Sequence, residues 1–242
     1  MDKIVIYLAE GGDEALAYDL ANKIEAPVLD CPGDELTVVF DSTGVSLKGY
    51  GLSYQGDFEG MIRRVTKGRV YHEMLIKAAK SNKEGLKAID ATAGMGEDGF
   101  LLAAYGYEVT LCEQNPVIAC LLSDALRRAG KNPVIKEIAD RMTVVAGDSI
   151  ELMKANMVQV DLVYLDPMFP GRQKSGLINK KLQLIQKMEA PCSEEEELFD
   201  AAIAVGPSKI IVKRPLKSKH LADRKPNYML KGKAIRYDCY VY

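Results

Sequence analysis

Four acidic side chains stand at the ends of four short apolar runs that read as β-strands. The runs lie at 87–90, 109–112, 142–146 and 162–165, and the acids that close or follow them are Asp90, Glu113, Asp148 and Asp166. The carboxyl ends of neighbouring parallel strands line one crevice in an open α/β sheet. We therefore expect the four carboxylates to meet around one ligand, whose ammonium, hydroxyl or amino groups they can bind.

The segment that follows the last run, Asp166 to Pro170, contains the residue types needed to hold the amino group of a flat base. The carboxylate of Asp166 and the carbonyl of Pro167 can accept the two N–H bonds of an exocyclic amine, and the Phe169 ring offers a stacking face. Taken alone, Asp-Pro after a strand is also a common turn. With the other acids, the segment predicts Asp166, Pro167 and Phe169 as catalytic residues.

The turn after Asp90 is rich in glycine. Gly94, Gly96 and Gly99 match the G-x-G-x-x-G fingerprint of dinucleotide-binding proteins, and an apolar helix follows. In that fingerprint the first glycine follows the strand almost directly, whereas three small residues separate Asp90 from Gly94 here. An acid in this place suits a ligand's ammonium group better than a pyrophosphate. An NAD-dependent oxidoreductase, the alternative from another class, leaves Asp90 unexplained.

The remaining two acids suit the sugar and the base of the same ligand. Glu113 lies 23 residues after Asp90, close to the spacing at which an acid beyond a glycine loop accepts both ribose hydroxyls. Asp148 and Ser149 offer a carboxylate and a hydroxyl that can reach an adenine edge. Together with the glycine loop, the four acids predict a binding site for S-adenosylmethionine.

The order of these motifs resembles that of class I S-adenosylmethionine-dependent methyltransferases. The strings 90–96, 113–117 and 164–175, together with 211–215, are similar to those of the RsmJ-like family of bacterial 16S ribosomal RNA guanine-N2 methyltransferases. The similarity covers roughly residues 60 to 242. Besides Asp90, Gly94 and Gly96, the resemblance implies cofactor contacts at Glu97, Asp98, Glu113, Gln114, Asp148, Ser149 and Asp166.

The resemblance implies methyl transfer to the exocyclic N2 amine of a guanine near the 3′ end of the small-subunit (16S) ribosomal RNA. Adenine-N6 or other amino-directed nucleic-acid methylation is the alternative, since it uses a similar Asp-Pro-x-aromatic grip; Met168 in place of a second proline favours guanine. A small-molecule amine methyltransferase would not need the basic segments described next. A non-catalytic RNA-binding module would leave Asp166 and Phe169 without a purpose.

Basic residues are strongly segregated along the chain, although its formal net charge is only −2. Three segments, 61–80, 172–187 and 213–236, hold 20 of the 32 lysines and arginines but only two acids. Such a cationic rim favours a polyanion such as RNA as partner, and a merely solvated basic face is the alternative. The resemblance implies that this RNA is ribosomal RNA or the small ribosomal subunit. The predicted RNA-binding residues are Arg63, Arg64, Arg69, Arg172, Lys174, Lys180, Lys181, Lys213 and Arg214.

Composition sets further bounds on the chain of 242 residues. Its 48% apolar content supports a buried core, and no run approaches 18 consecutive apolar residues, so we expect no membrane span. The start lacks the pattern of a signal peptide, which predicts a cytoplasmic protein. Five cysteines without a C-x-x-C pair predict neither a zinc site nor a disulfide framework. No cysteine lies where a cytosine-C5 methyltransferase needs its nucleophile.

Strand and helix alternate from residue 87 onward, which is typical of an α/β protein with a mostly parallel sheet. With the resemblance, this predicts a Rossmann-like class I methyltransferase fold: a mostly parallel seven-stranded sheet with helices on both faces. We expect a methyltransferase domain over 61–242 and a small N-terminal α/β subdomain over 1–60. Within the larger domain, the pattern predicts a helix over 70–79, a helix that begins at Asn115-Pro116, and a final strand over 235–241.

Overall fold

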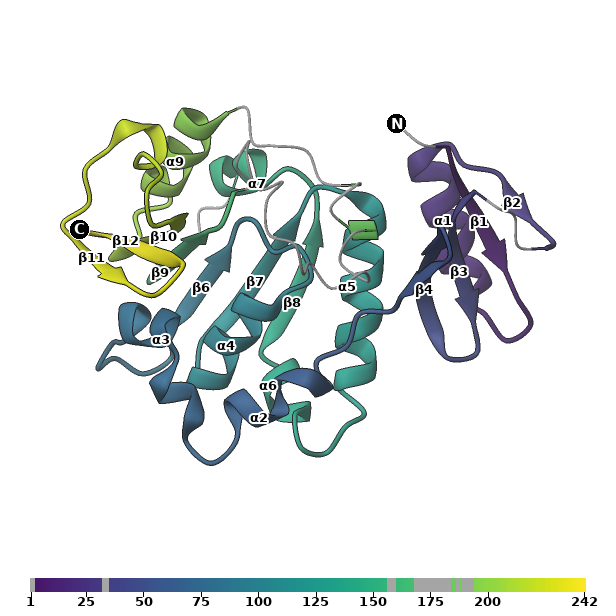
Figure 1. Ribbon diagram of the computed structural model, residues 1–242, viewed down its shortest axis with the longest axis horizontal. Helices are drawn as coiled ribbons and strands as arrows, with labels where there is room; N and C mark the ends of the chain where they lie inside the picture. The colour runs from purple at the N-terminus through teal and green to yellow at the C-terminus, as the bar shows by residue number, and fades with distance from the viewer. Residues whose placement is uncertain (1–2, 32–34, 156–159, 168–183, 186–187, 189–193) are drawn as a thin grey trace.

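The larger of two sheets contains seven strands in the order β11-β12-β10-β9-β6-β7-β8 (Figure 1). The computed structural model describes residues 3–31, 35–155, 160–167, 184–185, 188 and 194–242. Strands β10, β9, β6, β7 and β8 run parallel, whereas β12 pairs antiparallel with both β10 and β11. The strands are β6 Lys87–Asp90, β7 Glu108–Glu113, β8 Met142–Ala146, β9 Leu162–Leu165, β10 Lys209–Pro215, β11 Tyr228–Lys231 and β12 Ile235–Val241.

Helices cover both faces of this sheet, because alternate strand residues point to opposite sides. Ala88 packs into a cluster with α3, α4 and α5, whereas Ile89 and Val163 pack into a second cluster with α7 and α9. Figure 1 shows the two helical layers. The predicted class I fold is confirmed. The helices are α3 Met74–Ala79, α4 Glu97–Tyr105, α5 Pro116–Ala129, α6 Lys136–Ala139, α7 Ser149–Ala155 and α9 Glu195–Ala204.

The start of α5 follows its sequence signals. The side chain of Asn115 accepts hydrogen bonds from the N–H groups of Val117 and Ile118, at 3.0 and 3.3 Å, and Pro116 occupies the first turn. This cap satisfies donors that a helix start otherwise leaves unpaired. The predicted helix start is confirmed.

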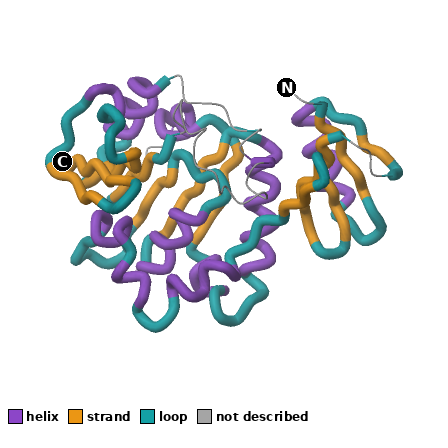
Figure 2. The backbone as a smooth tube through the Cα atoms, viewed as in Figure 1, coloured by secondary structure: helices purple, strands orange, loops and turns teal. Residues whose placement is uncertain are grey.

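The smaller sheet is N-terminal and has five strands in the order β2-β1-β3-β4-β5. Its apolar side chains, with those of α1, pack against α5, so that α5 lies between the two sheets (Figure 2). Strands β2 and β5 have two and three residues, too few to show an alternating pattern in the sequence. The elements are β1 Ile4–Leu8, α1 Glu14–Ile24, β2 Val28–Leu29, β3 Leu36–Asp41, β4 Gly44–Gly49 and β5 Leu52–Tyr54. A domain boundary at residue 60 stays a prediction.

The segment between the two sheets is built from short turns of helix. The predicted helix over 70–79 is confirmed only in its second half, because Glu73 is extended (ψ 135°) and separates a 3-10 turn from α3. The Glu73 carboxylate accepts two hydrogen bonds from Arg64, both at 2.8 Å, which fixes this break. The short elements are η1 Glu59–Met61, α2 Ile62–Val65 and η2 Arg69–His72, with η3 Leu221–Asp223 near the C-terminus.

A buried carboxylate joins α5 to the N-terminal sheet. Asp124 is 3% exposed and pairs with Arg127 at 2.6 Å and Arg128 at 2.8 Å. Arg128 also donates to the carbonyl of Gly56 in the linker. Gly44, at the start of β4, lies so close that a Cβ there would be 2.5 Å from Asp124 Oδ2. Within the described residues, no helix is long and apolar enough to cross a membrane.

Gly44→Ala is expected to destabilise the protein more than an alanine at an otherwise similar glycine. Gly106 provides that control, since its φ is also 125° and nothing lies within 4 Å of an added Cβ. Gly106→Ala should cost about 1–3 kcal/mol through backbone strain. Gly44→Ala should cost about 1–3 kcal/mol more, because the Cβ displaces the pinned Asp124 carboxylate. Denaturant-induced unfolding measures both losses, and equal values would show that Asp124 moves aside freely.

Candidate active site

The acidic residues gather where the chain order of the large sheet changes direction. From β6 the chain proceeds to β7 and β8 on one side, and then returns to β9 on the other side of β6. Ligands of open α/β sheets bind outside the carboxyl ends of the strands at such a switch point. Asp90 pairs in register with Tyr164, so Asp166 extends just beyond the end of β6. The candidate site is the crevice between these two strand ends.

Asp90 lies at the floor of the crevice. It is 1% exposed, and its Oδ1 accepts a hydrogen bond from the Thr92 N–H at 3.2 Å. Burial, and then the charge of Asp98, raise the pKa of Asp90 well above its ordinary value. A carboxyl in this setting releases its proton more readily when a cationic group binds next to it.

Lys213 links two further acids across the crevice. Its Nζ lies 2.7 Å from Asp98 Oδ2 and 2.8 Å from Asp166 Oδ2. Burial alone would lower the pKa of Lys213, but the charges of Asp98 and Asp166 more than offset this and raise it. The Tyr164 hydroxyl donates to Asp98 Oδ2 at 2.6 Å, and the N–H of Asp166 donates to Thr92 Oγ1 at 2.6 Å. Two carboxylates therefore meet at one ammonium, and the buried Asp90 is near enough to interact with its charge.

Glu113, at the end of β7, is held by two backbone N–H groups. Gly94 donates to its Oε2 at 2.9 Å and Asn115 to its Oε1 at 2.8 Å. Burial raises the pKa of Glu113, while these two hydrogen bonds act in the opposite direction. Each carboxylate oxygen retains a second lone pair, so the fixed Glu113 can still accept hydroxyl donors.

Two glycines of the fingerprint secure helix α4 against the sheet. Gly96 adopts a left-handed conformation (φ 77°), and a Cβ there would lie 2.7 Å from Leu122 Cδ1. A Cβ on Gly99 would lie 2.3 Å from Leu111 Cδ2. Packing therefore explains why both residues are glycine, and a cofactor contact at Gly94 or Gly96 stays a prediction.

The other predicted cofactor residues lie at the outer part of the same strand ends. Gln114, Asp148 and Glu97 are exposed, and Ser149 is the first residue of α7. The carboxylate of Asp148 accepts the N–H of Ile150 at 2.8 Å, which fixes the start of that helix.

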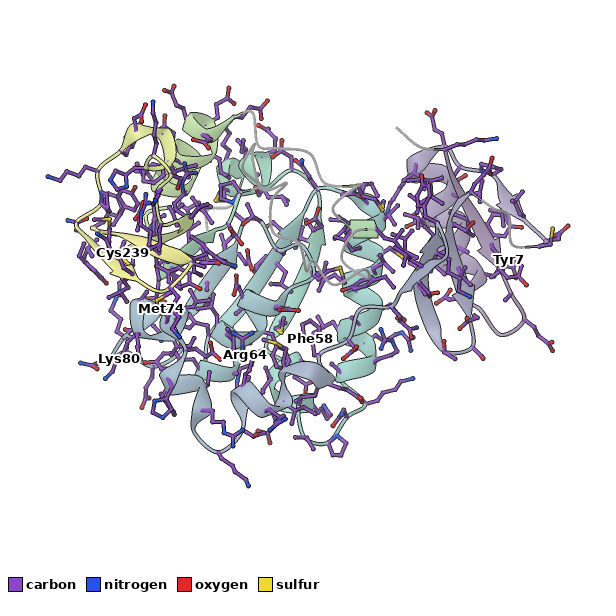
Figure 3. All side chains as sticks on the ribbon, in the orientation of Figure 1. Tyr7, Phe58, Arg64, Met74, Lys80 and Cys239 are labelled. Carbon is purple, nitrogen blue, oxygen red and sulfur yellow. The ribbon has the colours of Figure 1, made fainter. Side chains whose placement is uncertain are left out.

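The predicted RNA-binding residues fall into three groups. Arg63 and Arg69 are exposed. Arg64, which is labelled in Figure 3, is paired with Glu73. Lys213 belongs to the crevice, and Arg214 is buried, where it contacts Glu195 at 3.3 Å. The third group lies outside the described part of the chain and consists of Arg172, Lys174, Lys180 and Lys181. The predicted catalytic residue Phe169 also lies outside it.

Sequence reasoning missed two residues of the crevice and the role of a third. Thr92 and Tyr164 were not predicted as site residues, and Lys213 was expected to face RNA rather than two acids. One signal was available for Tyr164, the single hydroxyl in an otherwise aliphatic strand and two positions before Asp166. Residues two apart on a strand share a face.

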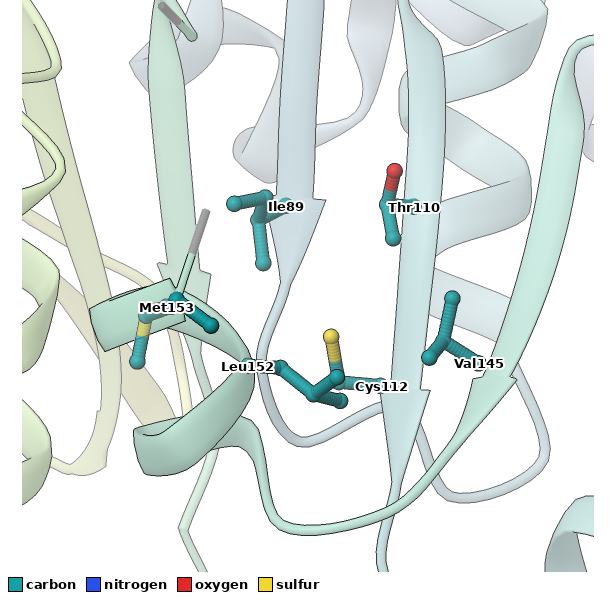
Figure 4. Close-up of a pocket in the computed structure, with 7 residues that line it drawn as sticks. Ile89, Thr110, Cys112, Val145, Leu152 and Met153 are labelled. Carbon is teal, nitrogen blue, oxygen red and sulfur yellow. The ribbon is translucent and has the colours of Figure 1, made fainter. Parts of the chain in front are cut away.

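An apolar pocket of about 220 Å³ lies on the opposite face of the sheet, under α7 (Figure 4). Among the described residues that line it, the titratable group is the Cys112 thiol, whose pKa burial raises to about 12. We therefore place the chemistry in the acidic crevice. The pocket is lined by Ile89, Thr110, Cys112, Val145, Leu152, Met153 and Ala155. Among the described residues, no group of three or more His, Cys, Asp or Glu side chains is arranged to hold a metal ion.

Comparisons with known proteins show to which family the chain belongs. The model of a family described as "Putative SAM-dependent methyltransferase" matches residues 48–242, which include every strand of the large sheet. The chain belongs to this family of methyltransferases. Its relatives include "Ribosomal RNA small subunit methyltransferase J" of Thioalkalivibrio sulfidiphilus, which is 33% identical over 93% of this chain and 92% of its own length. The RsmJ-like resemblance is thereby confirmed, and S-adenosylmethionine (SAM) is the cofactor of the family.

Two further comparisons define the extent of the similarity. The protein of the same name from Pseudomonas aeruginosa (strain UCBPP-PA14) is 45% identical over 155 residues, which span 64% of this chain and 59% of that relative's length. A crystal structure of a SAM-dependent methyltransferase from Neisseria gonorrhoeae superimposes with a TM-score of 0.78 at 30% identity, covering 98% of this chain and 95% of that one. The structural similarity thus extends over both sheets.

Glu113→Ala is expected to weaken SAM binding by about 1.5–3 kcal/mol, because a charged acceptor for the ribose hydroxyls is lost. Glu108→Ala, at the exposed first position of the same strand, is the matched control and should leave the affinity unchanged. Calorimetric titration with SAM measures both variants, and unfolding curves show whether each is folded. Unchanged affinity in folded Glu113→Ala would refute the assignment of Glu113 to the ribose.

Proposed function

We propose that this methyltransferase transfers a methyl group from SAM to the exocyclic N2 amine of a guanine in 16S ribosomal RNA. The observation that carries the proposal is the position of Asp166, fixed by Thr92 and Lys213 at the switch point beside Asp90. The names of the relatives support small-subunit ribosomal RNA as the substrate. The Asp-Pro-Met-Phe segment supports an exocyclic amine of a base as the acceptor.

The charge of the crevice fits SAM. Asp98 and Asp166 share a single ammonium and Asp90 lies nearby, so an additional cationic ligand is electrostatically favoured there. When bound, SAM supplies an electrophilic methyl group on a cationic sulfur and also carries an ammonium group. In this proposal Glu113 accepts the ribose hydroxyls. The residues that we propose for cofactor binding are Asp90, Gly94, Gly96, Glu97, Asp98, Glu113, Gln114, Asp148, Ser149 and Asp166.

Asp166 and Pro167 serve the acceptor base in this proposal. The Asp166 carboxylate and the Pro167 carbonyl accept the two amine hydrogens, which favours a pyramidal nitrogen whose lone pair is available for attack. Alignment of this nitrogen with the transferred carbon is the main catalytic task. The nitrogen lone pair would form a bond to the methyl carbon as the carbon–sulfur bond of SAM breaks, with the electron pair of that bond staying on the sulfur of the departing neutral thioether. The nitrogen becomes positively charged and then loses a proton to water or to Asp166. A base inside a helix cannot reach the crevice, so the guanine must be unpaired or flipped out.

Asp166→Ala is expected to abolish methyl transfer in a folded protein, whereas Asp166→Asn should keep part of the rate because its amide oxygen still accepts one N–H bond. Asp161→Asn, which alters an acid immediately before the same strand, is the control and should stay active. The assay uses labelled SAM with 16S RNA or small subunits, followed by nucleoside mass spectrometry. Near wild-type turnover by Asp166→Ala would place the acceptor site elsewhere, and N6-methyladenosine as product would refute guanine-N2 specificity.

Arg63 of α2 and Arg69 of η2 are both exposed, and Arg69 donates to the Arg63 carbonyl at 3.1 Å. We propose that both bind RNA phosphates. The double variant Arg63→Ala/Arg69→Ala should then bind RNA more weakly, and its salt slope (log affinity against log salt) should be shallower by about 0.7–0.9 per lost contact. Lys23→Ala/Lys136→Ala, which removes two exposed lysines elsewhere, should match the wild type. Parallel salt slopes for the wild type and both double variants would exclude Arg63 and Arg69 from the RNA interface.

A further inference from the structure

The crevice contains a lysine whose role neither the proposed cofactor contacts nor the RNA contacts explain. Lys213 lies on β10, one residue beyond Val212, which pairs in register with Leu165 of β9. It is therefore level with Asp166 on the neighbouring strand. Its side chain is 18% exposed, and those of Asp98 and Asp166 are 20% and 19% exposed. An ammonium held this closely by two half-buried acids is poorly placed to meet an RNA phosphate.

The groups around this ammonium come from every element that packs against it. Asp90 comes from β6 and Asp98 from α4, while β9 supplies Tyr164 and Asp166. Tyr237 of β12 lies directly across from Lys213 in the antiparallel pair. Arg64 also acts on Asp98 through its charge, but its guanidinium is bonded to Glu73. Among the described residues, Lys213 is thus the cation in contact with the acids of the crevice.

We propose that Lys213 is a positioning residue for methyl transfer, and that its ammonium holds the Asp166 carboxylate in place and keeps it ionised. The inference rests on the proposed function, because it assigns Asp166 to the acceptor amine. Lys213 acts through Asp166 and does not itself bind the base.

The physical reason is the repulsion between the carboxylates of Asp98 and Asp166, which meet at one ammonium in a partly buried crevice. Without that cation the two charges disfavour each other, which favours protonation of one carboxyl. A protonated carboxyl carries an O–H donor where the substrate amine also presents donors, so it accepts fewer N–H bonds. Lys213 removes this conflict and also fixes one oxygen of Asp166.

The inference is tested by three variants: Lys213→Met, which removes the charge at similar length, Lys213→Arg, which keeps it, and Lys209→Met as control. Lys209 lies on the same strand, four residues earlier, and its Nζ donates to the Ala78 carbonyl at 2.8 Å, away from the crevice. Each protein is assayed for kcat and for KM with RNA between acidic and alkaline pH. SAM affinity and thermal unfolding are measured in parallel.

We expect Lys213→Met to lower kcat at least about tenfold on the acid side of its pH profile while KM for RNA stays within about twofold. The rate should recover at higher pH, because deprotonation restores the acceptor. The acid limb of its pH profile should therefore lie about one to three pH units above that of the wild type, the usual effect of one adjacent charge. Lys213→Arg should keep the wild-type limb and most of the rate, and Lys209→Met should match the wild type throughout.

Two results would overturn the inference. A raised KM for RNA with a shallower salt slope, an unchanged kcat and an unshifted acid limb would make Lys213 a phosphate contact. Equal losses in Lys213→Arg and Lys213→Met without a pH shift would show that the charge is not what matters. If Lys213→Met does not fold, Lys213→Arg decides, since lost turnover in that folded variant refutes the inference. An inactive wild type would instead refute the proposed function.

Discussion

One ammonium among three carboxylates is the constraint on which the rest of the crevice depends. Carboxylates at neighbouring strand ends repel one another, and burial of Asp90 increases the cost of its charge. Lys213 offsets this repulsion for Asp98 and Asp166, and the balance that remains is negative. The crevice can thus receive a cationic ligand on one side and an amine on the other. The net charge of the crevice and the polar groups that it offers to a ligand come from the same four side chains, those of Asp90, Asp98, Asp166 and Lys213.

Backbone groups complete what the charged side chains begin. Glu113 is oriented by the N–H groups of Gly94 and Asn115, and Asp166 is oriented through its own N–H to Thr92. Each of these donors lies just after a strand or in the glycine turn, where no ladder partner is available to it. The acids are therefore placed by the fold itself, and a ligand need not reorganise the crevice to bind.

Sequence reasoning located the sheet, the strand-end acids and the cap at Asn115 because each depends on local pattern. Strand periodicity and turn chemistry reach only a few residues along the chain. The contact of Lys213 with Asp98 joins residues more than one hundred positions apart, and it depends on β10 pairing with β9. The break at Glu73 likewise depends on its pairing with Arg64, which no helical pattern encodes. The two features that the sequence did not predict thus depend on ion pairs, which local sequence patterns do not encode.

Helix α5 has a consequence for how the chain can be divided. Its residues Val117, Ile118 and Leu121 are 0–1% exposed and pack with the N-terminal sheet, while Leu122 and Ala125 pack with the large sheet. A chain without residues 4–54 would present the first three side chains to water, at about 1.5–3 kcal/mol each. The same helix begins at Pro116, three residues after Glu113. The small sheet is thus part of the scaffold of the cofactor crevice, and the two are not interchangeable modules.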